Sequence, residues 1–153
     1  MSALELKIPP PAVALVFAIS MWGISLCTPA LNDDNLAHIF AASIIALIGV
    51  SFSVAGVIAF RRAKTTLNPN KPADASSLVT SGIYRFTRNP MYVGLLIVLV
   101  SWAGFLNAPW TLIVPAVFFA YISRYQIAPE EKVLLSIFGD TYNDYKVNIR
   151  RWL

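Results

Sequence analysis

The chain has 153 residues, of which 57% are hydrophobic and 13% are charged, and its mean hydropathy is +0.63. This composition lies outside the range of soluble globular domains, so it excludes a water-soluble extracellular domain and indicates an integral membrane protein. The net charge is +4, but the basic residues are dispersed and no recognition motif accompanies them. They therefore favour contact with anionic membrane lipids and argue against a nucleic-acid partner.

Four apolar runs come close to the roughly 20 residues that an α-helix needs to cross about 30 Å of hydrocarbon. They are residues 12–31, 36–60, 90–106 and 110–127. Only Asn107, Ala108 and Pro109 separate the last two runs, and these turn residues predict an antiparallel helical hairpin. We expect one all-α membrane domain over residues 1–153, a helical bundle of four transmembrane helices with short cytoplasmic helices after them.

The basic residues also predict how the chain is oriented in the membrane. All twelve Lys and Arg residues lie in the first segment, in the arm at residues 61–89, or near and beyond the end of the fourth run. The other two loops hold none, and the first of them, residues 32–35, is acidic. The positive-inside rule then places both termini and the arm in the cytoplasm, at the plasma membrane if the source is prokaryotic.

Two residue types that bind metals occur only once each. Cys27 is the only cysteine and His38 is the only histidine, so neither an intrachain disulfide nor a zinc cluster can form. We expect no metal site. Cys27 is expected to be a buried bystander, and His38 to contact a helix end or a lipid headgroup.

The start of the third run combines a helix start with charged residues. Pro90 suits the first turn of a helix, because its missing N–H would be unpaired there anyway. The free amides of Met91 and Tyr92 would then point toward the cytoplasm and attract a carboxylate, helped by Arg85 and Arg88 just upstream. The sequence thus predicts an anion-binding helix start at the membrane boundary.

The segment after the fourth run, residues 128–153, predicts a cytoplasmic cap. A short amphipathic helix is expected first, over Pro129–Gly139, with Glu130 and Glu131 in its first turn and Gly139 at its end. A second short helix follows from about Thr141, and together the two would form a lid over the cytoplasmic helix ends. Both acids fit helix capping alone, but they also leave the membrane on the same side as the start of the third run.

Several motifs follow one another in order along the second half of the chain. They are Arg88-Asn89-Pro90-Met91-Tyr92, an apolar hairpin, Glu130-Glu131, Phe138-Gly139, and Tyr142 with Tyr145. In these motifs the chain, over roughly residues 78–153, resembles the isoprenylcysteine carboxyl methyltransferase family in a prokaryotic form, within a wider circle that includes the phospholipid methyltransferases. The resemblance implies a helical membrane transferase that uses S-adenosylmethionine, which fits the absence of a G-x-G-x-x-G loop. Eukaryotic members usually have His where this chain has Asn89, so a His-based proton transfer is not available there.

The resemblance and the chemistry of methyl transfer together suggest residue roles. S-adenosylmethionine carries its own activated methyl group, so the protein mainly has to hold donor and acceptor in line, and S-adenosylhomocysteine is the product. The candidate cofactor-binding residues are Tyr84, Arg88, Asn89, Pro90, Met91, Tyr92, Glu130 and Glu131. The candidate catalytic residues are Arg88, Glu131 as a base for an amine acceptor, and Arg150 to orient an anionic one. The acceptor would be lipophilic, with a carboxylate or a lipid amine as the methylated group, and would reach the site from the bilayer.

A non-enzymatic interpretation is also open, namely a helical membrane scaffold or a lipid-binding module with a basic rim. Such a protein has no reason to gather Arg88, Asn89, Tyr92 and the two glutamates in one place. The positions of these residues in the fold therefore separate the two interpretations. A transporter fits less well, because no apolar run has a charged residue at mid-depth.

Overall fold

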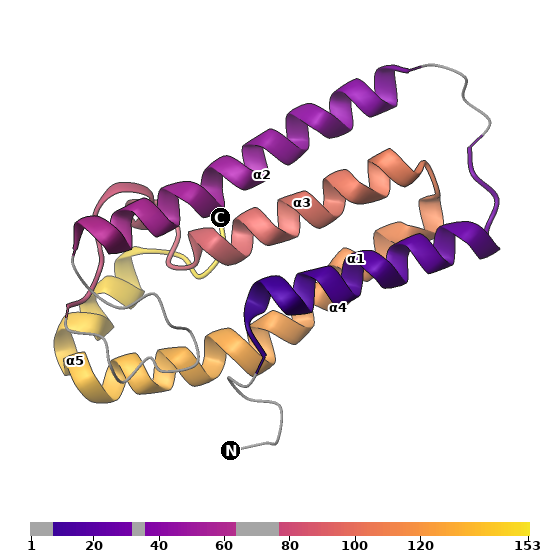
Figure 1. Cartoon of the computed structure of the whole chain (residues 1–153). Coiled ribbons are helices and arrows are strands. Elements are labelled where there is room, and N and C mark those ends of the chain that lie inside the picture. The colour runs from indigo at the N-terminus through magenta and orange to yellow at the C-terminus, as the bar shows by residue number, and fades with distance from the viewer. Residues whose placement is uncertain (1–7, 32–35, 64–76) are drawn as a thin grey trace.

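The computed structural model describes residues 8–31, 36–63 and 77–153, which form a bundle of long helices (Figure 1). The long helices are α1 (Pro10–Cys27), α2 (Ala37–Arg62), α3 (Pro90–Leu106), α4 (Ile113–Ile122) and α5 (Ala128–Asn148). Shorter helical turns are η2 (Gly82–Arg85), η3 (Pro109–Leu112) and η4 (Ser123–Ile127). Part of the predicted cytoplasmic arm, and the acidic loop before α2, lie outside the described residues.

The helices suit a membrane in length and composition. α1, α2 and the continuous helical segment Pro109–Asn148 are each long and apolar enough to cross a membrane. α3 is apolar too, and its 17 residues span about 26 Å at 1.5 Å per residue. All regular structure in the described ranges is helical, so the predicted fold class is confirmed.

Proline sets the boundaries of two helices. The first apolar run continues to residue 31, but α1 ends at Cys27 because Thr28 precedes Pro29 and is extended, with φ −127° and ψ 148°. Cys27 is exposed at this end rather than buried as expected. α3 begins at Pro90, the predicted first-turn position, where a missing N–H costs nothing.

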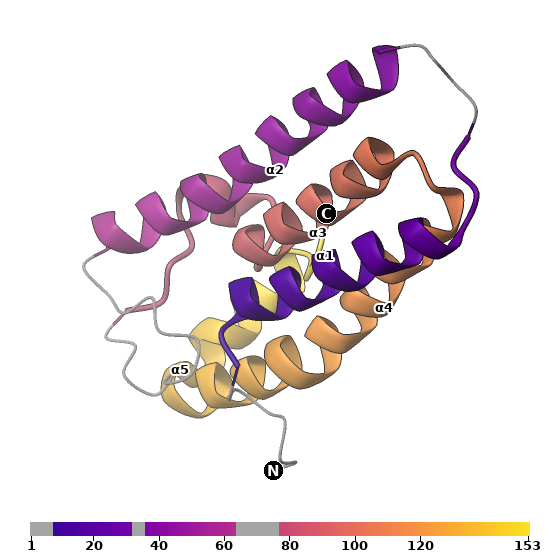
Figure 2. The ribbon, with the colours of Figure 1, turned by 45° about the vertical axis from the view of Figure 1, so that its right-hand side comes forward.

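α3 is the central helix, and it contacts α1, α2 and α4 (Figure 2). Its closest packing is on α2: a Cβ at Gly49 would lie only 2.8 Å from the Gly94 carbonyl oxygen, and a Cβ at Gly94 would overlap Ser53 Oγ. Ser101 Oγ adds a hydrogen bond to the Ala42 carbonyl at 2.6 Å. Small residues thus let the two backbones approach closely, as they do in many membrane helix pairs.

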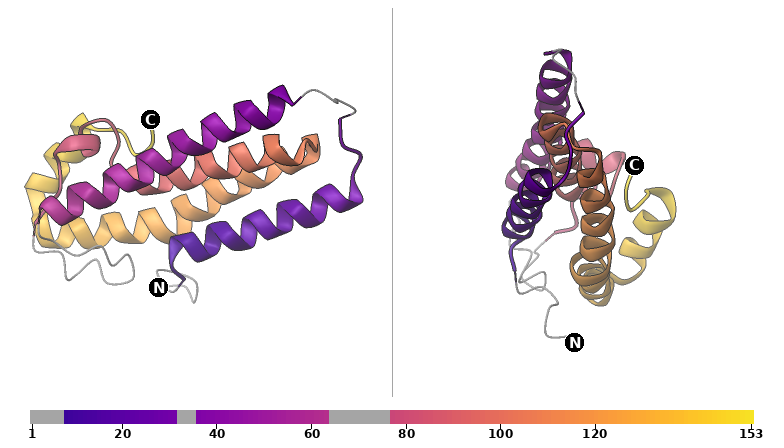
Figure 3. Two further views of the ribbon diagram at one scale, coloured as in Figure 1. Left: turned by 45° about the horizontal axis from the view of Figure 1, so that its top comes forward. Right: turned by 90° about the vertical axis from the view of Figure 1, so that its right-hand side faces the viewer.

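The fourth span passes directly into the C-terminal cap at residues 128–153. A separate helix is expected from Pro129, but the chain continues from α4 through a π-helical turn, η4, into α5. Pro129 has no N–H for the Tyr125 carbonyl and would clash with it in an α-helix, and the wider π turn accommodates the ring. The break comes at Gly139, where φ 50° and ψ −125° are not helical. The chain turns back there, so the second half of α5 approaches η2 (Figure 3).

Candidate functional site

A tight polar turn leads into α3. Thr87 is fully buried, and its Oγ1 accepts a hydrogen bond from the Asn89 N–H at 3.2 Å. Asn89 is the N-cap residue, and its carbonyl accepts a hydrogen bond from the Val93 N–H at 3.0 Å. This turn fixes the positions from which Arg88 and Tyr92 project.

Two adjacent glutamates in the first turn of α5 contact residues at the start of α3. The Tyr92 hydroxyl donates to Glu130 Oε1 at 2.6 Å, and these residues are 38 positions apart in the chain. Arg88 Nη1 lies 3.0 Å from Glu131 Oε1, and the two side chains are only 9% and 11% exposed. The starts of α3 and α5 therefore meet through their polar side chains at one end of the bundle.

A second arginine completes the pairing of Glu131. Arg151 Nη2 donates to Glu131 Oε2 at 2.6 Å, and Arg151 Nε donates to Oε1 at 3.1 Å, so the guanidinium binds the carboxylate in a bidentate way. The Arg151 side chain is 39% exposed and lies nearer to solvent than Arg88. In the described ranges, neither Nε nor Nη1 of Arg88 has an aligned hydrogen bond, although both are buried. Because Nη1 already forms an ion pair with Glu131, Nε is the buried Arg88 donor that another partner could use.

Tyrosines accompany these charges. Tyr84 and Tyr142 are buried, and the Tyr145 hydroxyl donates to the Tyr84 carbonyl at 2.7 Å. Burial, followed by the nearby Glu131, raises the pKa of Tyr142 to about 12. Burial also raises the pKa of Tyr84 and of Tyr145. These hydroxyls stay protonated at neutral pH and act as neutral hydrogen-bonding groups.

Glu130 differs from its neighbour, because its partner in the structure is the neutral Tyr92 hydroxyl and not an arginine. Burial raises the pKa of Glu130 to about 8, the Tyr92 hydrogen bond lowers it in part, and the adjacent Glu131 raises it again. At neutral pH this carboxyl group is mostly protonated, and a nearby cation would favour its ionised form. Glu131 is therefore already paired with two arginines, whereas Glu130 can change its protonation when a ligand binds. No cluster of three His, Cys, Asp or Glu side chains in the described ranges could hold a metal ion.

Known proteins resemble this chain over most of its length. The sequence model of the phospholipid methyltransferase family matches residues 36–141. The chain belongs to this family. With its apolar helices, it is a membrane methyltransferase.

The methyltransferase also resembles individual proteins. It is 33% identical over 123 residues to the protein-S-isoprenylcysteine O-methyltransferase of Schizosaccharomyces pombe, a match that covers 80% of this chain and 47% of the relative. The chain therefore spans about half the length of that relative. It is 41% identical over 63 residues to an uncharacterized protein of Haemophilus influenzae, which covers 41% of this chain and 100% of that protein. No solved structure matches the chain.

The structure brings together most of the predicted site residues of the methyltransferase. Those gathered are Tyr84, Arg88, Asn89, Tyr92, Glu130 and Glu131. Pro90 and Met91 start the same helix but face α2, and Met91 Cγ would lie 2.7 Å from a Cβ at Gly56. Arg150 is exposed, and the structure links it to the site through its carbonyl, which accepts a hydrogen bond from the Arg88 N–H at 2.9 Å. The helix start is therefore partly covered by α2. Of the two arginines near the end of the chain, Arg151 and not Arg150 binds Glu131.

Sequence alone assigns no role to Thr87, Tyr142, Tyr145 or Arg151, which all contribute to this site. Tyr142 and Tyr145 are three residues apart on the predicted second helix, so they share one face, and this pattern could have identified them as site residues. Nothing in the sequence separates Arg151 from Arg150. The direction of each side chain depends on the extended backbone that follows α5.

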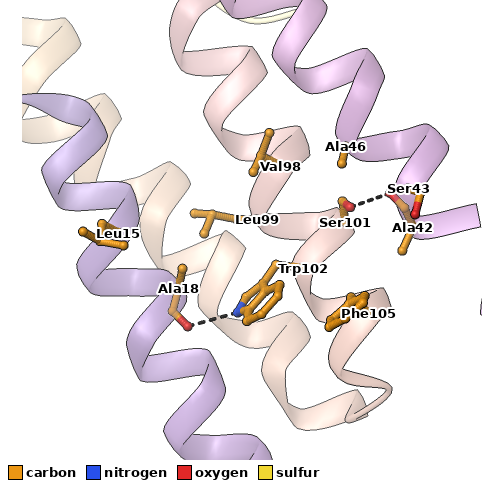
Figure 4. A pocket seen from close by; sticks show the side chains of 10 residues that line it. All are labelled: Leu15, Ala18, Ala42, Ser43, Ala46, Val98, Leu99, Ser101, Trp102 and Phe105. Atoms are coloured by element: carbon orange, nitrogen blue, oxygen red, sulfur yellow. Dashed lines mark hydrogen bonds between the residues drawn. The ribbon is translucent and has the colours of Figure 1, made fainter. Parts of the chain in front are cut away.

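An apolar groove of about 420 Å³ lies along the other end of α3 (Figure 4). It is lined by Leu15, Ala18, Ala42, Ser43, Ala46, Val98, Leu99, Ser101, Trp102 and Phe105. Trp102 Nε1 donates to the Ala18 carbonyl at 3.1 Å and Ser101 donates to Ala42, so these polar groups are already paired. The groove faces α1 and α2 and begins about 9 Å beyond Tyr92 along α3, at 1.5 Å per residue. It is not part of the candidate site.

Proposed function

We propose that this membrane methyltransferase uses S-adenosylmethionine to methylate a lipophilic acceptor, with the carboxylate of an isoprenylcysteine as the first candidate. The observation that carries the proposal is the meeting of Arg88 with Glu131 and of Tyr92 with Glu130, in a chain of this family. A scaffold or lipid-binding module has no need for such a buried cluster. The acceptor follows from the name of the S. pombe relative, protein-S-isoprenylcysteine O-methyltransferase.

The residues present suit the charges of S-adenosylmethionine, which has a carboxylate, an ammonium and a sulfonium. Glu130 would hold a cationic group, and the cation would lower its raised pKa. Arg88 would donate to the carboxylate from its buried Nε, which has no hydrogen-bond partner among the described residues. The rings of Tyr84 and Tyr142 suit a cation through its attraction to aromatic faces. When bound, the cofactor supplies an activated methyl group, so the protein needs no nucleophilic side chain.

The two glutamates would have different roles. Glu131 is held by Arg88 and Arg151, so it would orient Arg88 rather than accept a proton. A carboxylate acceptor is already ionised at neutral pH and requires no base. An amine acceptor must lose a proton, and Glu130, with a pKa of about 8, would be the better base for it. Arg150, which is exposed beside the site, would orient an anionic acceptor from the cytoplasmic surface.

The acceptor class can be tested with purified protein in lipid vesicles and S-adenosylmethionine that carries a radiolabelled methyl group. The probes are an S-farnesylcysteine derivative with a free carboxylate, the matching carboxamide, and vesicles that contain phosphatidylethanolamine. We expect label only with the free carboxylate, as a methyl ester that mild base converts to volatile methanol. Base-stable label in phosphatidylethanolamine would show that the methylated group is a lipid amine and not a carboxylate. No label with any probe, from protein that binds S-adenosylhomocysteine, would overturn both acceptor classes.

A further inference from the structure

The chain stays at the site after α5 ends. Residues 149–153, here named the strap, turn away from the helix at Ile149, which is extended with φ −122° and ψ 133°. The Arg150 carbonyl then accepts a hydrogen bond from the Arg88 N–H at 2.9 Å. The end of the chain consequently lies close to the start of α3 (Figures 1 and 3).

Arg151 contacts the site with both its main chain and its side chain. Its carbonyl accepts hydrogen bonds from Asn89 Nδ2 at 2.9 Å and from Thr87 Oγ1 at 3.2 Å. Its guanidinium holds both oxygens of Glu131, at 2.6 and 3.1 Å. One residue of the strap thus fixes the Asn89 side chain and also the carboxylate that faces Arg88.

Trp152 fastens the strap to the membrane part of the bundle. Its ring lies 4.6 Å from that of Phe119 in α4, measured between ring centroids. Phe119 is about 18 Å along the helix from Glu131, at 1.5 Å per residue. Neighbouring residues of the strap therefore bind the same long helical segment at two well-separated points.

We propose that the strap is a positioning element, and that Arg151 is the positioning residue that keeps Arg88 available to the methyl donor; this rests on the function proposed above. Arg151 donates to both oxygens of Glu131, and the contact of Arg88 with this carboxylate is from Nη1 to Oε1 alone. Without Arg151, Glu131 is free to turn and form a forked pair with Arg88, which is the stronger geometry for a guanidinium and a carboxylate. The buried Nε of Arg88, which has no hydrogen-bond partner among the described residues, would then face Glu131 instead of the ligand.

The test compares Arg151→Ala and Arg151→Lys with Lys146→Ala, which removes an exposed cation of α5. Each protein is titrated with S-adenosylhomocysteine and assayed for the KM of S-adenosylmethionine and for kcat. Arg151→Ala should weaken binding and raise this KM on the order of tenfold, with a smaller loss of kcat. Arg151→Lys should recover only part of the loss, because an ammonium cannot form the fork. Lys146→Ala should match the wild type.

A double variant separates positioning from general stability. In Glu131→Gln the neutral amide attracts Arg88 less, so adding Arg151→Ala should cost little further affinity. The inference would be overturned if Arg151→Ala lowered the affinity as much in the Glu131→Gln background as in the wild type. An Arg151→Ala protein with unchanged affinity and KM would overturn it as well. The thermal unfolding midpoint shows that each variant is folded. Wild-type protein that fails to bind S-adenosylhomocysteine would instead overturn the proposed function, so the two failures are distinguishable.

Discussion

Adjacent glutamates in the first turn of α5 have opposite surroundings. Glu131 lies between the guanidinium groups of Arg88 and Arg151. Glu130 contacts the Tyr92 hydroxyl, and burial raises its pKa to about 8. These two neighbours therefore differ in role: Glu131 holds the site together, whereas the charge of Glu130 depends on pH and on a ligand.

The pH dependence of ligand binding tests this difference. The ammonium of S-adenosylhomocysteine favours ionised Glu130, so its affinity should rise between about pH 6 and pH 8, by up to about tenfold per pH unit. Glu130→Gln should bind more weakly and without this pH dependence. Calorimetry in buffers of different ionisation enthalpy measures both the affinity and the proton released on binding. A pH-independent affinity in the wild type would show that Glu130 does not meet the ligand cation.

The stability of the ligand-free protein should change with pH in the opposite direction. The folded-state pKa of Glu130, about 8, lies above its usual value of 4.5. The folded state therefore binds more protons between these values, and this contribution to stability is present below pH 4.5 and lost as the pH rises through 8. Unfolding midpoints of the wild type should fall over this range, and those of Glu130→Gln should fall less. Asp140→Asn, which changes an exposed acid of the same helix, should behave as the wild type.

Among the elements, the pair of α2 and α3 depends on glycine. A Cβ at Gly94 would overlap Ser53 Oγ and the Gly49 carbonyl oxygen. We expect Gly94→Ala to destabilise the protein by about 1–3 kcal/mol, because backbone has to move to make room. Thermal unfolding in a mild detergent measures the change. Gly23→Ala is the matched control, since a Cβ there meets nothing within 4 Å; a loss of stability as large as that of Gly94→Ala would contradict the packing argument.

The turn in α5 depends on a glycine for a different reason. Gly139 has φ 50° and ψ −125°, a conformation that side chains with a Cβ rarely adopt, although the space around it is open. Gly139→Ala should cost about 1–3 kcal/mol of strain. It should also weaken S-adenosylhomocysteine binding, because Tyr142 and Tyr145 lie beyond the turn. Asp140→Ala controls for a change at the neighbouring exposed position, and equal binding by both variants would mean that the turn does not place the tyrosines.

Helix starts could be predicted from sequence better than the path of the last helix. Pro90 predicts the start of α3 because its missing N–H fits only the first turn. At Pro129 the sequence predicts the start of a separate helix, and this prediction is wrong, because a π turn lets the chain continue from α4 into α5. A π turn inserts one residue and so rotates every later side chain by about 100° around the axis. Which glutamate meets which partner therefore could not be predicted from sequence.

For the molecule as a whole, the sequence placed the candidate residues on one side of the membrane but not in contact. The meeting of Arg88, Tyr92 and the two glutamates depends on how α2, α3 and α4 pack together. The contribution of the strap depends on an extended segment without periodicity, so no local pattern predicts it. These long-range contacts come from the fold, whereas the charge asymmetry and apolar runs are visible in the residues themselves.

The orientation of the molecule remains a prediction, with both termini in the cytoplasm. Cys27, the only cysteine, is exposed and is the last residue of α1. This end of α1 lies at the opposite end of the bundle from α5 (Figure 1). In sealed cells a membrane-impermeant maleimide should label Cys27 from outside. In a Cys27→Ser background, Lys146→Cys should be labelled only after the membrane is opened. The reverse pattern would show that the candidate site faces the outside.

Titration of purified protein with S-adenosylhomocysteine, in detergent and again in lipid, measures directly whether the starts of α3 and α5 together hold a methyl donor. We expect saturable heat from the wild type, and none from a variant with both Glu130→Gln and Glu131→Gln that still unfolds cooperatively. No saturable heat from the wild type in either medium, or undiminished binding by the double variant, would contradict a methyl-donor site formed by these residues.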